Sequence, residues 1–394
     1  MTGFDAVIIG AGVLGAATAL DLAESGLSVL VLERGAPNRE GSGTTAGNLH
    51  IQAVHTRRPG QSVPLDSRAL LPAQKASGDL WAEAEERLDA DLEVRRNGGF
   101  MVAETPGQCA ELRTKHLWEE QSGLRTEVLD GDAAREALPL LGPTVEAATW
   151  CPDDGYANPL KVAPAYLAAA RRNAAQVRAF TPVTGLERRG ARWRVETPAG
   201  RYDTPVVINV AGPWLGDVCA MAGIRLRMSP VAIQMHATVR ERPLLHHLVQ
   251  HIGEGMSVKQ VTSGNLLIGG GWPARRMEQE GRSHASSRSL TGNVAQAARI
   301  LPVLSGLRLL RMWAGPLAAT PDEMPLIGAV PGAPGFYVAG GTYAFTFAPL
   351  WGETLGRLIR EEQPRVDVSP FSPDRLTETG RASLTPTRKG VTPC

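Results

Sequence analysis

Three glycines near the start of the chain, Gly10, Gly12 and Gly15, have the spacing G-x-G-x-x-G. In such a turn the first glycine permits a tight reversal, the second lets the backbone approach a pyrophosphate, and the third lets a helix pack closely on a strand. Glu33 follows about twenty residues later, where a carboxylate can accept a hydrogen bond from a ribose hydroxyl. These residue types at this spacing predict a dinucleotide site.

The elements around the glycines support that prediction. An apolar run at residues 6–9 precedes them, an Ala- and Leu-rich stretch follows and ends near Gly26, and a second apolar run at residues 27–32 closes on Glu33. This order predicts a strand, a helix and a strand, with the helix N-terminus supplying amide donors and partial positive charge to phosphates. An ordinary βαβ unit with a tight turn is the alternative, and the glycines alone do not distinguish FAD from NAD.

The next segment narrows the choice of cofactor. Residues 41–50, GSGTTAGNLH, form a loop of small residues after Glu33 and Arg34. Together with the glycine fingerprint it resembles the D-amino-acid oxidase family of flavoproteins. Four later segments resemble that family in the same order: T-P-V at residues 181–183, VVINVAGPW at 206–214, WAGPLAATPDEMPLIG at 313–328, and GFYVAGGTYAFTFAPLWG at 335–352. The resemblance covers the chain from residue 5 to about residue 360.

The resemblance implies that FAD is the cofactor and suggests which residues would contact it. The loop at 41–50 would run beneath the pyrophosphate and the isoalloxazine, the backbone of Val183 would contact adenine, and the turn after residue 340 would lie under the flavin ring. The residues expected to bind the cofactor are Gly10, Ala11, Gly12, Val13, Leu14, Gly15, Glu33, Arg34, Thr44, Thr45, Ala46, Gly47, Asn48, Leu49, Val183, Ala211, Gly212, Trp214, Gly341, Phe345, Thr346 and Phe347.

The chain departs from the family where the substrate carboxylate would bind. Amino-acid-oxidising relatives place an arginine shortly after W-A-G, and a guanidinium can clamp a carboxylate with two hydrogen bonds. Here Leu317 occupies that position. Ser257 stands where glycine oxidase-like sequences tend to have tyrosine, and Thr342-Tyr343 follows Gly341 where many relatives have Gly-His. The missing clamp favours secondary amines or larger derivatives over glycine and simple D-amino acids.

Several residues could replace the clamp or orient the amine. Lys259, Arg57 and Arg58 are the candidate cations, and His50, His55 and His236 are the candidate imidazoles. Tyr343 lies in the turn expected near the flavin ring. We take Tyr343, His50 and Lys259 as the candidate catalytic residues. The alternatives are a solvent-facing Lys259, histidines with a purely structural role, and a Tyr343 that packs on Phe345 and Phe347. His246, His247 and His251 are predicted to lie on the surface and to bind no metal.

The fold predicted is α/β, or α+β overall, with two discontinuous domains. Residues 1–50, 145–215 and 306–363 are expected to form a Rossmann-like FAD-binding domain. Residues 51–144 and 216–305 are expected to form a substrate domain around an antiparallel sheet, because residues 225–275 alternate between apolar and polar side chains. Residues 364–394, rich in Pro, Ser, Thr and Arg, are expected to be a poorly ordered polar tail.

Composition excludes several function classes. The 41 basic and 40 acidic residues of the 394 give a net charge of +1, whereas a nucleic-acid binder would carry a basic stripe. No run of about eighteen apolar residues predicts a membrane-spanning helix. Cys109, Cys151, Cys219 and Cys394 show no paired spacing, so they predict no metal site, no disulfide framework and no iron–sulfur cluster. Reduced thiols of this kind indicate a cytoplasmic protein.

The functional prediction is FAD-dependent oxidation of a small amine or amino-acid derivative to an imine that hydrolyses. Residues 151–160, CPDDGYANPL, and the G-N-L-H-I-Q loop resemble the subunits of heteromeric dehydrogenases that oxidise opines, D-hydroxyproline, glycine or sarcosine. That resemblance implies partner subunits with further redox centres. The alternatives are a single-chain oxidase that releases peroxide and a noncatalytic flavin-binding assembly subunit.

Overall fold

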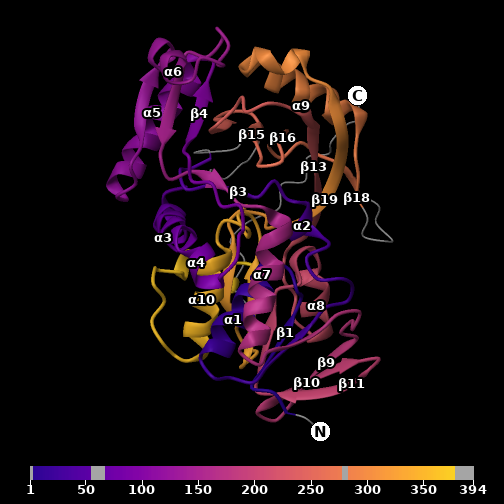
Figure 1. The fold of residues 1–394 in the computed structure, drawn as a ribbon. Coiled ribbons are helices and arrows are strands. Elements are labelled where there is room, and N and C mark those ends of the chain that lie inside the picture. Colours follow the sequence, from indigo (N-terminus) through magenta and orange to yellow (C-terminus); the bar gives the residue numbers. More distant parts are fainter. Residues whose placement is uncertain (1–2, 55–66, 277–282, 378–394) are drawn as a thin grey trace, which may run out of the picture.

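The computed structural model of the chain describes residues 3–54, 67–276 and 283–377. Its elements form two bodies, one below the other in Figure 1. The lower body holds a parallel sheet with its helices, and the upper body holds a larger, mostly antiparallel sheet. The candidate residues His55, Arg57 and Arg58 lie outside the described residues.

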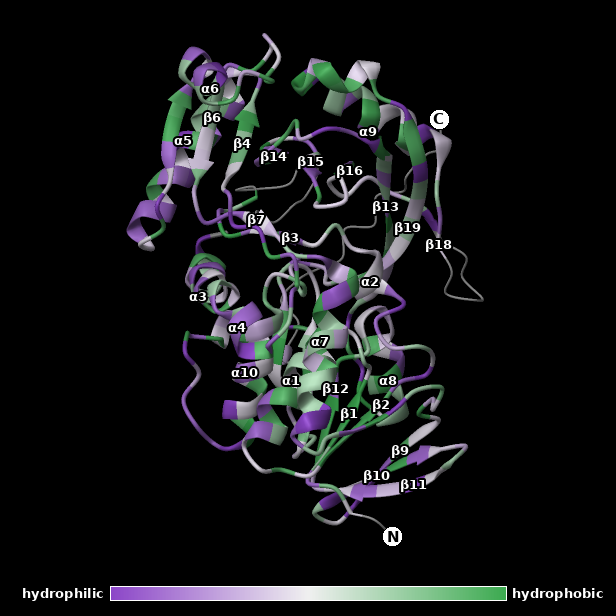
Figure 2. Ribbon diagram, in the orientation of Figure 1, coloured by the Kyte–Doolittle hydropathy of each residue, from purple (hydrophilic) through white to green (hydrophobic). Residues whose placement is uncertain are grey.

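The lower sheet has six strands in the order β20-β21-β12-β1-β2-β8. All neighbours are parallel except β20, which runs antiparallel to β21. Every residue of β1 is buried, and continuous apolar runs are typical of parallel strands covered on both faces. Figure 2 shows β1 and β12 as strongly hydrophobic. The strands are β1 (Ala6–Ile9), β2 (Val29–Leu32), β8 (Gln176–Arg178), β12 (Val206–Asn209), β20 (Leu326–Ala329) and β21 (Phe336–Gly340).

Helices cover one face of this sheet, with α1 at their centre. Ten of the twelve residues of α1 are buried, and its alanines let neighbouring helices approach closely. A Cβ on Gly352 of α10 would lie 2.8 Å from the Cβ of Ala17, so α10 crosses α1 at its glycine. The helices are α1 (Val13–Glu24), α3 (Leu71–Ala82), α4 (Ala84–Leu88), α7 (Pro159–Arg172) and α10 (Ala348–Ile359).

The other face of the lower sheet carries a three-stranded antiparallel sheet and a short helix. These are β9 (Gly185–Arg189), β10 (Arg192–Thr197), β11 (Gly200–Thr204) and α8 (Leu215–Met221), with the 3₁₀ turn η2 (Gly212–Trp214) before α8. Trp193, Tyr202 and Phe336 belong to the core between the layers. The three strands lie in the order β11-β10-β9, so consecutive strands of this sheet are neighbours.

The upper sheet has eight strands in the order β19-β13-β16-β15-β14-β4-β6-β5. Its pairings are antiparallel except that of β14 with β4. The strands are β4 (Gly99–Ala103), β5 (Glu127–Asp130), β6 (Ala147–Cys151), β13 (Ser229–Arg240), β14 (Leu248–His251), β15 (Ser257–Gln260), β16 (Asn265–Gly269) and β19 (Leu309–Ala319). The antiparallel sheet predicted for residues 225–275 is therefore present.

Three helices and several short elements complete the structure. The helices α5 (Pro106–Gln121), α6 (Gly131–Ala137) and α9 (Ser287–Ile300) pack on the upper sheet, α6 and α9 on one face and α5 on the other. The short elements are α2 (Gly41–Thr44), the pair β3 (Asn48–Leu49) and β7 (Gly155–Tyr156), the pair β17 (Arg275–Arg276) and β18 (Ser283–His284), and the 3₁₀ turns η1 (Ser67–Ala69), η3 (Pro302–Gly306), η4 (Ser369–Phe371) and η5 (Pro373–Arg375). No helix in the described ranges has the length and apolar character that crossing a bilayer requires.

The mixed α/β fold is confirmed, but some elements lie across the predicted domain boundaries. β6 and β19 fall in ranges expected to belong to the FAD-binding domain, yet they hydrogen-bond into the upper sheet. Conversely, α3 falls in the range 51–144 expected for the substrate domain, yet Leu71 and Trp81 pack into the lower core. The chain therefore crosses between the two bodies more often than the sequence pattern indicated.

The described part of the expected polar tail, residues 364–377, packs against the lower body. Phe371 is fully buried, and its ring centroid lies 5.5 Å from that of Trp351 in α10. The guanidinium of Arg375 pairs with the Asp322 carboxylate at 2.7 Å. One apolar anchor and one ion pair fix residues 364–377 against the lower body, although their composition is polar.

Candidate active site

A cavity of about 900 Å³ lies between the two bodies. The glycine turn, the loop after Glu40 and the turn after Gly340 line it from the lower body. Strand β13, the connection between β14 and β15, and the end of β16 line it from the upper body. Segments that are far apart in the sequence therefore share one space, of the size usual for small-molecule sites.

The glycine turn has the close contacts that its spacing predicts. Gly10 has a φ of +109°, and a Cβ there would lie 2.8 Å from the carbonyl oxygen of Val210. A Cβ on Gly15 would lie only 1.9 Å from the carbonyl oxygen of Gly10, so α1 contacts the end of β1 through this glycine. Gly12 is the N-cap residue of α1 and has no capping side chain, so the helix N-terminus opens to the cavity.

Glu33 is held at the end of β2 by two backbone donors. Its Oε2 accepts from the N–H of Ala11 at 2.9 Å, and its Oε1 accepts from that of Gly35 at 2.8 Å. The carboxylate lines the cavity with Arg34, whose guanidinium stacks 3.4 Å above the ring of Trp214. This end of the cavity presents a fixed carboxylate and a flat cation, which suits the ribose and adenine of a dinucleotide.

The loop at 41–50 lies between the glycine turn and β19. A Cβ on Gly315 would lie 1.9 Å from the Thr44 Oγ1, and the indole nitrogen of Trp313 donates to the carbonyl oxygen of Thr44 at 2.9 Å. Ser42 Oγ in turn accepts from the N–H of Val13 at 3.0 Å. The small residues of this loop thus bring β19 and the start of α1 together at the cavity.

The turn after β21 forms the opposite wall. The carbonyl oxygen of Thr346 accepts from Ser77 Oγ at 2.5 Å and from the indole nitrogen of Trp81 at 2.7 Å, so α3 anchors the turn. Thr346 Oγ1 also donates to the carbonyl oxygen of Asn48 at 3.2 Å. Tyr343 has a φ of +59°, which is uncommon for a bulky residue, and it lines the cavity.

The predicted cofactor residues divide into two groups. Those that line the cavity are Gly10, Gly12, Val13, Leu14, Glu33, Arg34, Thr44, Thr45, Ala46, Asn48, Val183, Ala211, Gly212, Trp214, Gly341, Phe345 and Thr346. Those that lie behind it and support the turns are Ala11, Gly15, Gly47, Leu49 and Phe347. The cavity fits FAD, because an open helix N-terminus, a fixed carboxylate and two loop walls face one elongated space.

Lys259 lies beneath the loop and not in solvent. Its side chain is only 2% exposed, and its ammonium donates to the carbonyl oxygen of Ala46 and, at 2.5 Å, to Asn48 Oδ1. The ammonium also lies 4.9 Å from the centroid of the Tyr156 ring. Burial lowers the pKa of Lys259 well below its usual range. Lys259 does not line the cavity, so it holds the loop and does not face the substrate space.

His50 lines the cavity beside Tyr343. Burial, together with the charge of Lys259, lowers the pKa of His50 to about 4, so its imidazole is neutral at pH 7. Its ring lies edge-on to that of Tyr343, with centroids 5.9 Å apart. The Nδ1 atom is buried and has no hydrogen-bond partner among the described residues. Tyr343 also packs on Phe347, with ring centroids 5.8 Å apart, whereas Phe345 stacks on Trp81.

Other predicted residues lie elsewhere. Leu317 lines the cavity, as expected for the position of the family arginine. His236 is buried on the opposite face of β13, 3.4 Å from the side chain of Gln234, and does not line the cavity. His251 was expected on the surface, but it is 3% exposed and lines the cavity. Its Nδ1 accepts from the N–H groups of Gly253 and Glu254, which shapes the connection between β14 and β15.

Sequence reasoning missed the polar residue that β14 contributes to the cavity. Gln250 is buried, lines the cavity, and stands opposite Ser257 in the β14–β15 pairing. The sequence did contain a signal for this residue, because Gln250 is a glutamine within an apolar strand and next to a cluster of histidines. Apolar side chains, including those of Ile233, Met235 and Met256, line the same cavity. Arg34 and Arg39 are the only arginine or lysine residues among the described residues that line the cavity, and both follow β2 in the chain.

Comparisons with known proteins agree with this geometry. The family model "DAO: FAD dependent oxidoreductase" matches residues 5–358. Glycine oxidase of Geobacillus kaustophilus (strain HTA426) is 26% identical over 373 residues, which cover 94% of this chain and 96% of that protein. The hydrogen cyanide synthase subunit HcnC of Pseudomonas aeruginosa (strain PAO1) is 29% identical over 407 residues, which cover 93% and 95%.

The crystal structure of L-proline dehydrogenase from P. horikoshii has the same fold, with a TM-score of 0.86 at 24% identity over 95% of this chain and 97% of that one. The family match includes the glycine turn, both cavity walls and all eight strands of the upper sheet. The chain therefore belongs to the DAO family of FAD-dependent oxidoreductases, enzymes that bind FAD and act on the C–N bonds of amines and amino acids.

Proposed function

We propose that this chain oxidises the C–N bond of a secondary amine, opine, imino acid or D-amino acid to an imine, which water then hydrolyses. The observation that carries the proposal is the shared cavity, in which the dinucleotide residues and the neutral His50 face one space. A protein that merely stored flavin would not need a neutral imidazole among the residues that line this cavity.

The chemistry requires an amine with an available lone pair. When bound, FAD accepts the hydrogen and the electron pair of the C–H bond next to the nitrogen. The nitrogen lone pair forms the C=N bond as two electrons leave the substrate, and the resulting iminium ion passes its N–H proton to water as it becomes the imine. His50 suits this step because its neutral imidazole can accept a hydrogen bond from the amine N–H and orient it. We assign Tyr343 to the wall that confines the amine beside His50.

The substrate end of the cavity favours amines that do not depend on a carboxylate clamp. Leu317 and the apolar side chains of Ile233, Met235 and Met256 supply contact area there. Burying an unpaired carboxylate among such groups is costly. We therefore propose that secondary amines and larger derivatives are better substrates than glycine. Lys259 is assigned to the flavin loop, where its ammonium holds Ala46 and Asn48.

We propose that the electrons leave through a partner subunit. One relative, at 29% identity, is named as a subunit of hydrogen cyanide synthase, which supports this choice over a lone oxidase. The described cysteines Cys109, Cys151 and Cys219 are buried and scattered, so a cluster would need another chain to carry it. We also propose a cytoplasmic location, because these three described cysteines are not paired in disulfides.

The test is an anaerobic screen for flavin bleaching with the purified chain. The amines are glycine, N-methylglycine, dimethylglycine, proline, iminodiacetate and an opine, each added to the oxidised protein under argon. Bleaching at 450 nm by a secondary amine or an opine is the expected result. If no amine bleaches the flavin, the chain is a noncatalytic assembly subunit and the proposal is wrong.

The same preparations separate the two catalytic alternatives. After reduction, the flavin is exposed to oxygen in one sample and to an artificial dye in another. Slow reoxidation by oxygen with fast dye reduction, and co-purification of other subunits with the native protein, support the heteromeric dehydrogenase. Rapid stoichiometric peroxide formation by the lone chain would instead establish a single-chain oxidase.

A further inference from the structure

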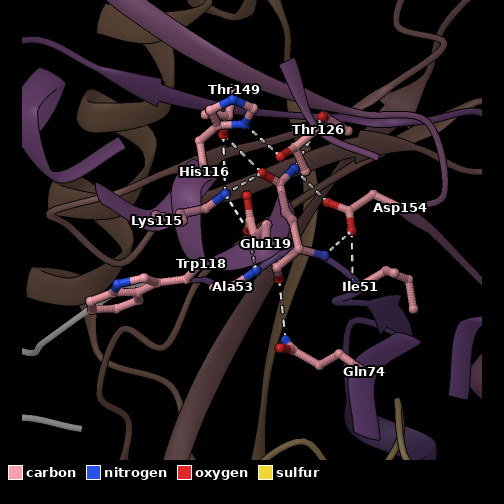
Figure 3. A network of polar contacts seen from close by, with 12 residues as sticks. Ile51, Ala53, Gln74, Lys115, His116, Trp118, Glu119, Thr126, Thr149 and Asp154 are labelled. Carbon is pink, nitrogen blue, oxygen red and sulfur yellow. Dashed lines mark hydrogen bonds and ion pairs between the residues drawn. The ribbon is translucent and has the colours of Figure 1, made fainter. Parts of the chain in front are cut away.

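The upper body holds charged residues in two different settings. Some are buried in a polar network, which Figure 3 shows and which includes Lys115, Glu119 and Asp154. Others are exposed where β13 ends and β19 begins, among them Arg240 and Arg308. The buried charges are compensated within the fold, whereas the exposed arginines can contact a partner.

Large apolar side chains are exposed beside these arginines. Leu309 is 41% exposed, Leu310 is 60% exposed and Met312 is 46% exposed, although all three belong to β19. Arg311 lies between them and is exposed as well, with its guanidinium 5.2 Å from the centroid of the Trp313 ring. Neighbouring exposed apolar side chains often mark a contact site, and here each of them is next to an arginine in the chain.

This end of the sheet is strongly cationic. We define the sheet-end patch as residues 240–242 and 308–312, two segments that meet because the carbonyl oxygen of Arg308 accepts from the N–H of Val239 at 2.8 Å. Its exposed arginines are Arg240, Arg242, Arg308 and Arg311. With Glu241 as the single acidic residue of these segments, four arginines and one glutamate give a net charge of +3, whereas the whole chain carries +1. Charge complementarity therefore favours an anionic partner.

The patch is poorly suited to pairing with a strand of a second copy. β19 is an edge strand, and an unprotected edge can add another strand. However, the pairing with β13 skips Leu310, which lies between the paired residues Leu309 and Arg311 and forms a bulge. A bulge interrupts the ladder and twists the edge away from such pairing. A second copy would also bring the arginines of both chains together.

The apolar part of the patch is too small for the core of a stable protein interface. Such an interface buries about 800 Å² on each partner and is usually anchored by aromatic side chains in pockets. Two leucines and a methionine on a strand edge supply neither. An anionic lipid surface requires no matching pocket, because leucine side chains insert below the headgroups while arginines extend to the phosphate groups.

We propose that the sheet-end patch binds the surface of an anionic membrane peripherally. Its arginines pair with lipid phosphates, and Leu309, Leu310 and Met312 enter the headgroup region. Each arginine near an anionic surface strengthens binding about fivefold, so the four together add substantially to three apolar contacts. No residue of the patch is among the described residues that line the cavity, so membrane contact and amine binding use different surfaces.

The test is co-sedimentation of the purified, FAD-loaded protein with lipid vesicles. One set of vesicles contains phosphatidylcholine alone, and the other contains phosphatidylglycerol as well. We expect binding to the vesicles with phosphatidylglycerol, little binding to phosphatidylcholine, and release at high salt, because salt screens the attraction between charges. Absence of binding to the anionic vesicles, or equal binding to both kinds, would overturn the proposal.

Two variants locate the contact on the protein. Arg311→Glu reverses one charge of the patch and should weaken vesicle binding roughly 25-fold. Leu310→Glu replaces the most exposed of the three apolar side chains by an anion and should weaken binding by at least about tenfold. Flavin absorbance shows whether each variant is folded, and neither residue lines the cavity, so both variants should retain FAD.

The matched controls make the same changes outside the patch. Arg171→Glu alters an exposed arginine of α7 in the lower body, and Leu117→Glu alters a leucine of α5 that is 55% exposed. Both controls should bind anionic vesicles within about threefold of the wild-type protein, because charges far from the membrane are screened. Equal losses in the patch variants and in the controls would show that only net charge matters, which would overturn the proposal.

A last comparison separates a lipid partner from a protein partner. If the wild-type protein binds no anionic vesicle, and if Arg311→Glu loses subunits that co-purify with the wild-type protein, the patch contacts a protein and the lipid proposal is wrong. The screen for flavin bleaching contains no lipid. Its failure would refute the proposed function and would leave this inference standing.

Discussion

Gly12→Val is expected to give a folded protein that has lost its flavin. A Cβ at Gly12 would lie 2.9 Å from Ser42 Oγ, and its only other neighbour within 4 Å is the Ser42 Cβ. A serine side chain can rotate away at the cost of its hydrogen bond with the N–H of Val13, about 1 kcal/mol. The folded polypeptide can therefore accommodate the valine. The pyrophosphate of FAD must approach this end of the helix, and the valine side chain would block that approach.

The expected loss of affinity follows from the hydrogen bonds that the valine blocks. Two charge-assisted bonds between backbone N–H groups and a diphosphate contribute about 1.5 kcal/mol each. Their loss, about 3 kcal/mol, corresponds to FAD binding that is at least about 100-fold weaker. Gly15→Ala differs, because its Cβ lies 1.9 Å from the Gly10 carbonyl oxygen and α1 would have to retreat about 1.5 Å to reach an ordinary contact of 3.4 Å. That variant should lose stability as well as flavin.

The assay compares flavin content and melting temperature. The flavin is quantified by absorbance of the purified protein and by fluorescence after denaturation. Gly107→Val is the matched control, because a Cβ there would have no neighbour within 4 Å. Stoichiometric FAD in Gly12→Val would refute this account of the glycine turn, and a flavin-free wild-type protein that binds NAD would refute the account of the cofactor.

Four further outcomes are expected. Lys259→Met should lower the free energy of unfolding by about 1–3 kcal/mol, measured by urea titration, because it leaves two buried loop acceptors without a donor. Burial raises the pKa of Asp154 to about 6, although Lys115 opposes the shift, so the folded state binds this proton more tightly than the unfolded chain does. The free energy of unfolding, measured by urea titration, should therefore fall as the pH rises from about 4 to about 6, and by more in the wild-type protein than in Asp154→Asn. The N-methyl group of N-methylglycine can contact the apolar side chains of the cavity, so kcat/KM for glycine should be at least about tenfold below that for N-methylglycine; equal values would show that these side chains do not contact the amine. Reduced flavin in the isolated chain should pass electrons to a dye faster than to oxygen, and oxygen-electrode traces showing the reverse would contradict a dehydrogenase.

The sequence was sufficient for the parts of the site that are local in the chain. The glycine turn and Glu33 belong to one βαβ unit, so spacing alone determines their relation. The loop at 41–50 was found through its small residues, which the close approach of Thr44 to Gly315 requires. Lys259 was identified as a candidate, but its burial beneath Ala46 depends on how β15 lies in the upper sheet.

The sequence was not sufficient for contacts that depend on several long-range pairings. Asp154 meets Gln250 only because β6, β4 and β14 are neighbours in the upper sheet. His251 resembled a surface residue because it lies in a polar histidine-rich segment, yet the connection after β14 folds over it. Composition also led to a wrong expectation of disorder around Phe371, because packing of its ring on Trp351 holds this otherwise polar segment in place.

The lower sheet pairs strands that are far apart in the sequence, and this has a consequence for biosynthesis. β1 pairs with β12, at residues 206–209, and β12 pairs with β21, at residues 336–340. The wall formed by Thr346 is made still later in translation. Such distant pairings slow folding, and the nucleotide end alone cannot form the cavity. FAD can therefore bind only to a nearly complete polypeptide. Bound FAD then stabilises the native state by mass action, and its contribution to the free energy of unfolding is RT ln(1 + [FAD]/Kd). Cells with too little flavin would accumulate the apoprotein, and faster synthesis of the chain would not increase the amount of active enzyme.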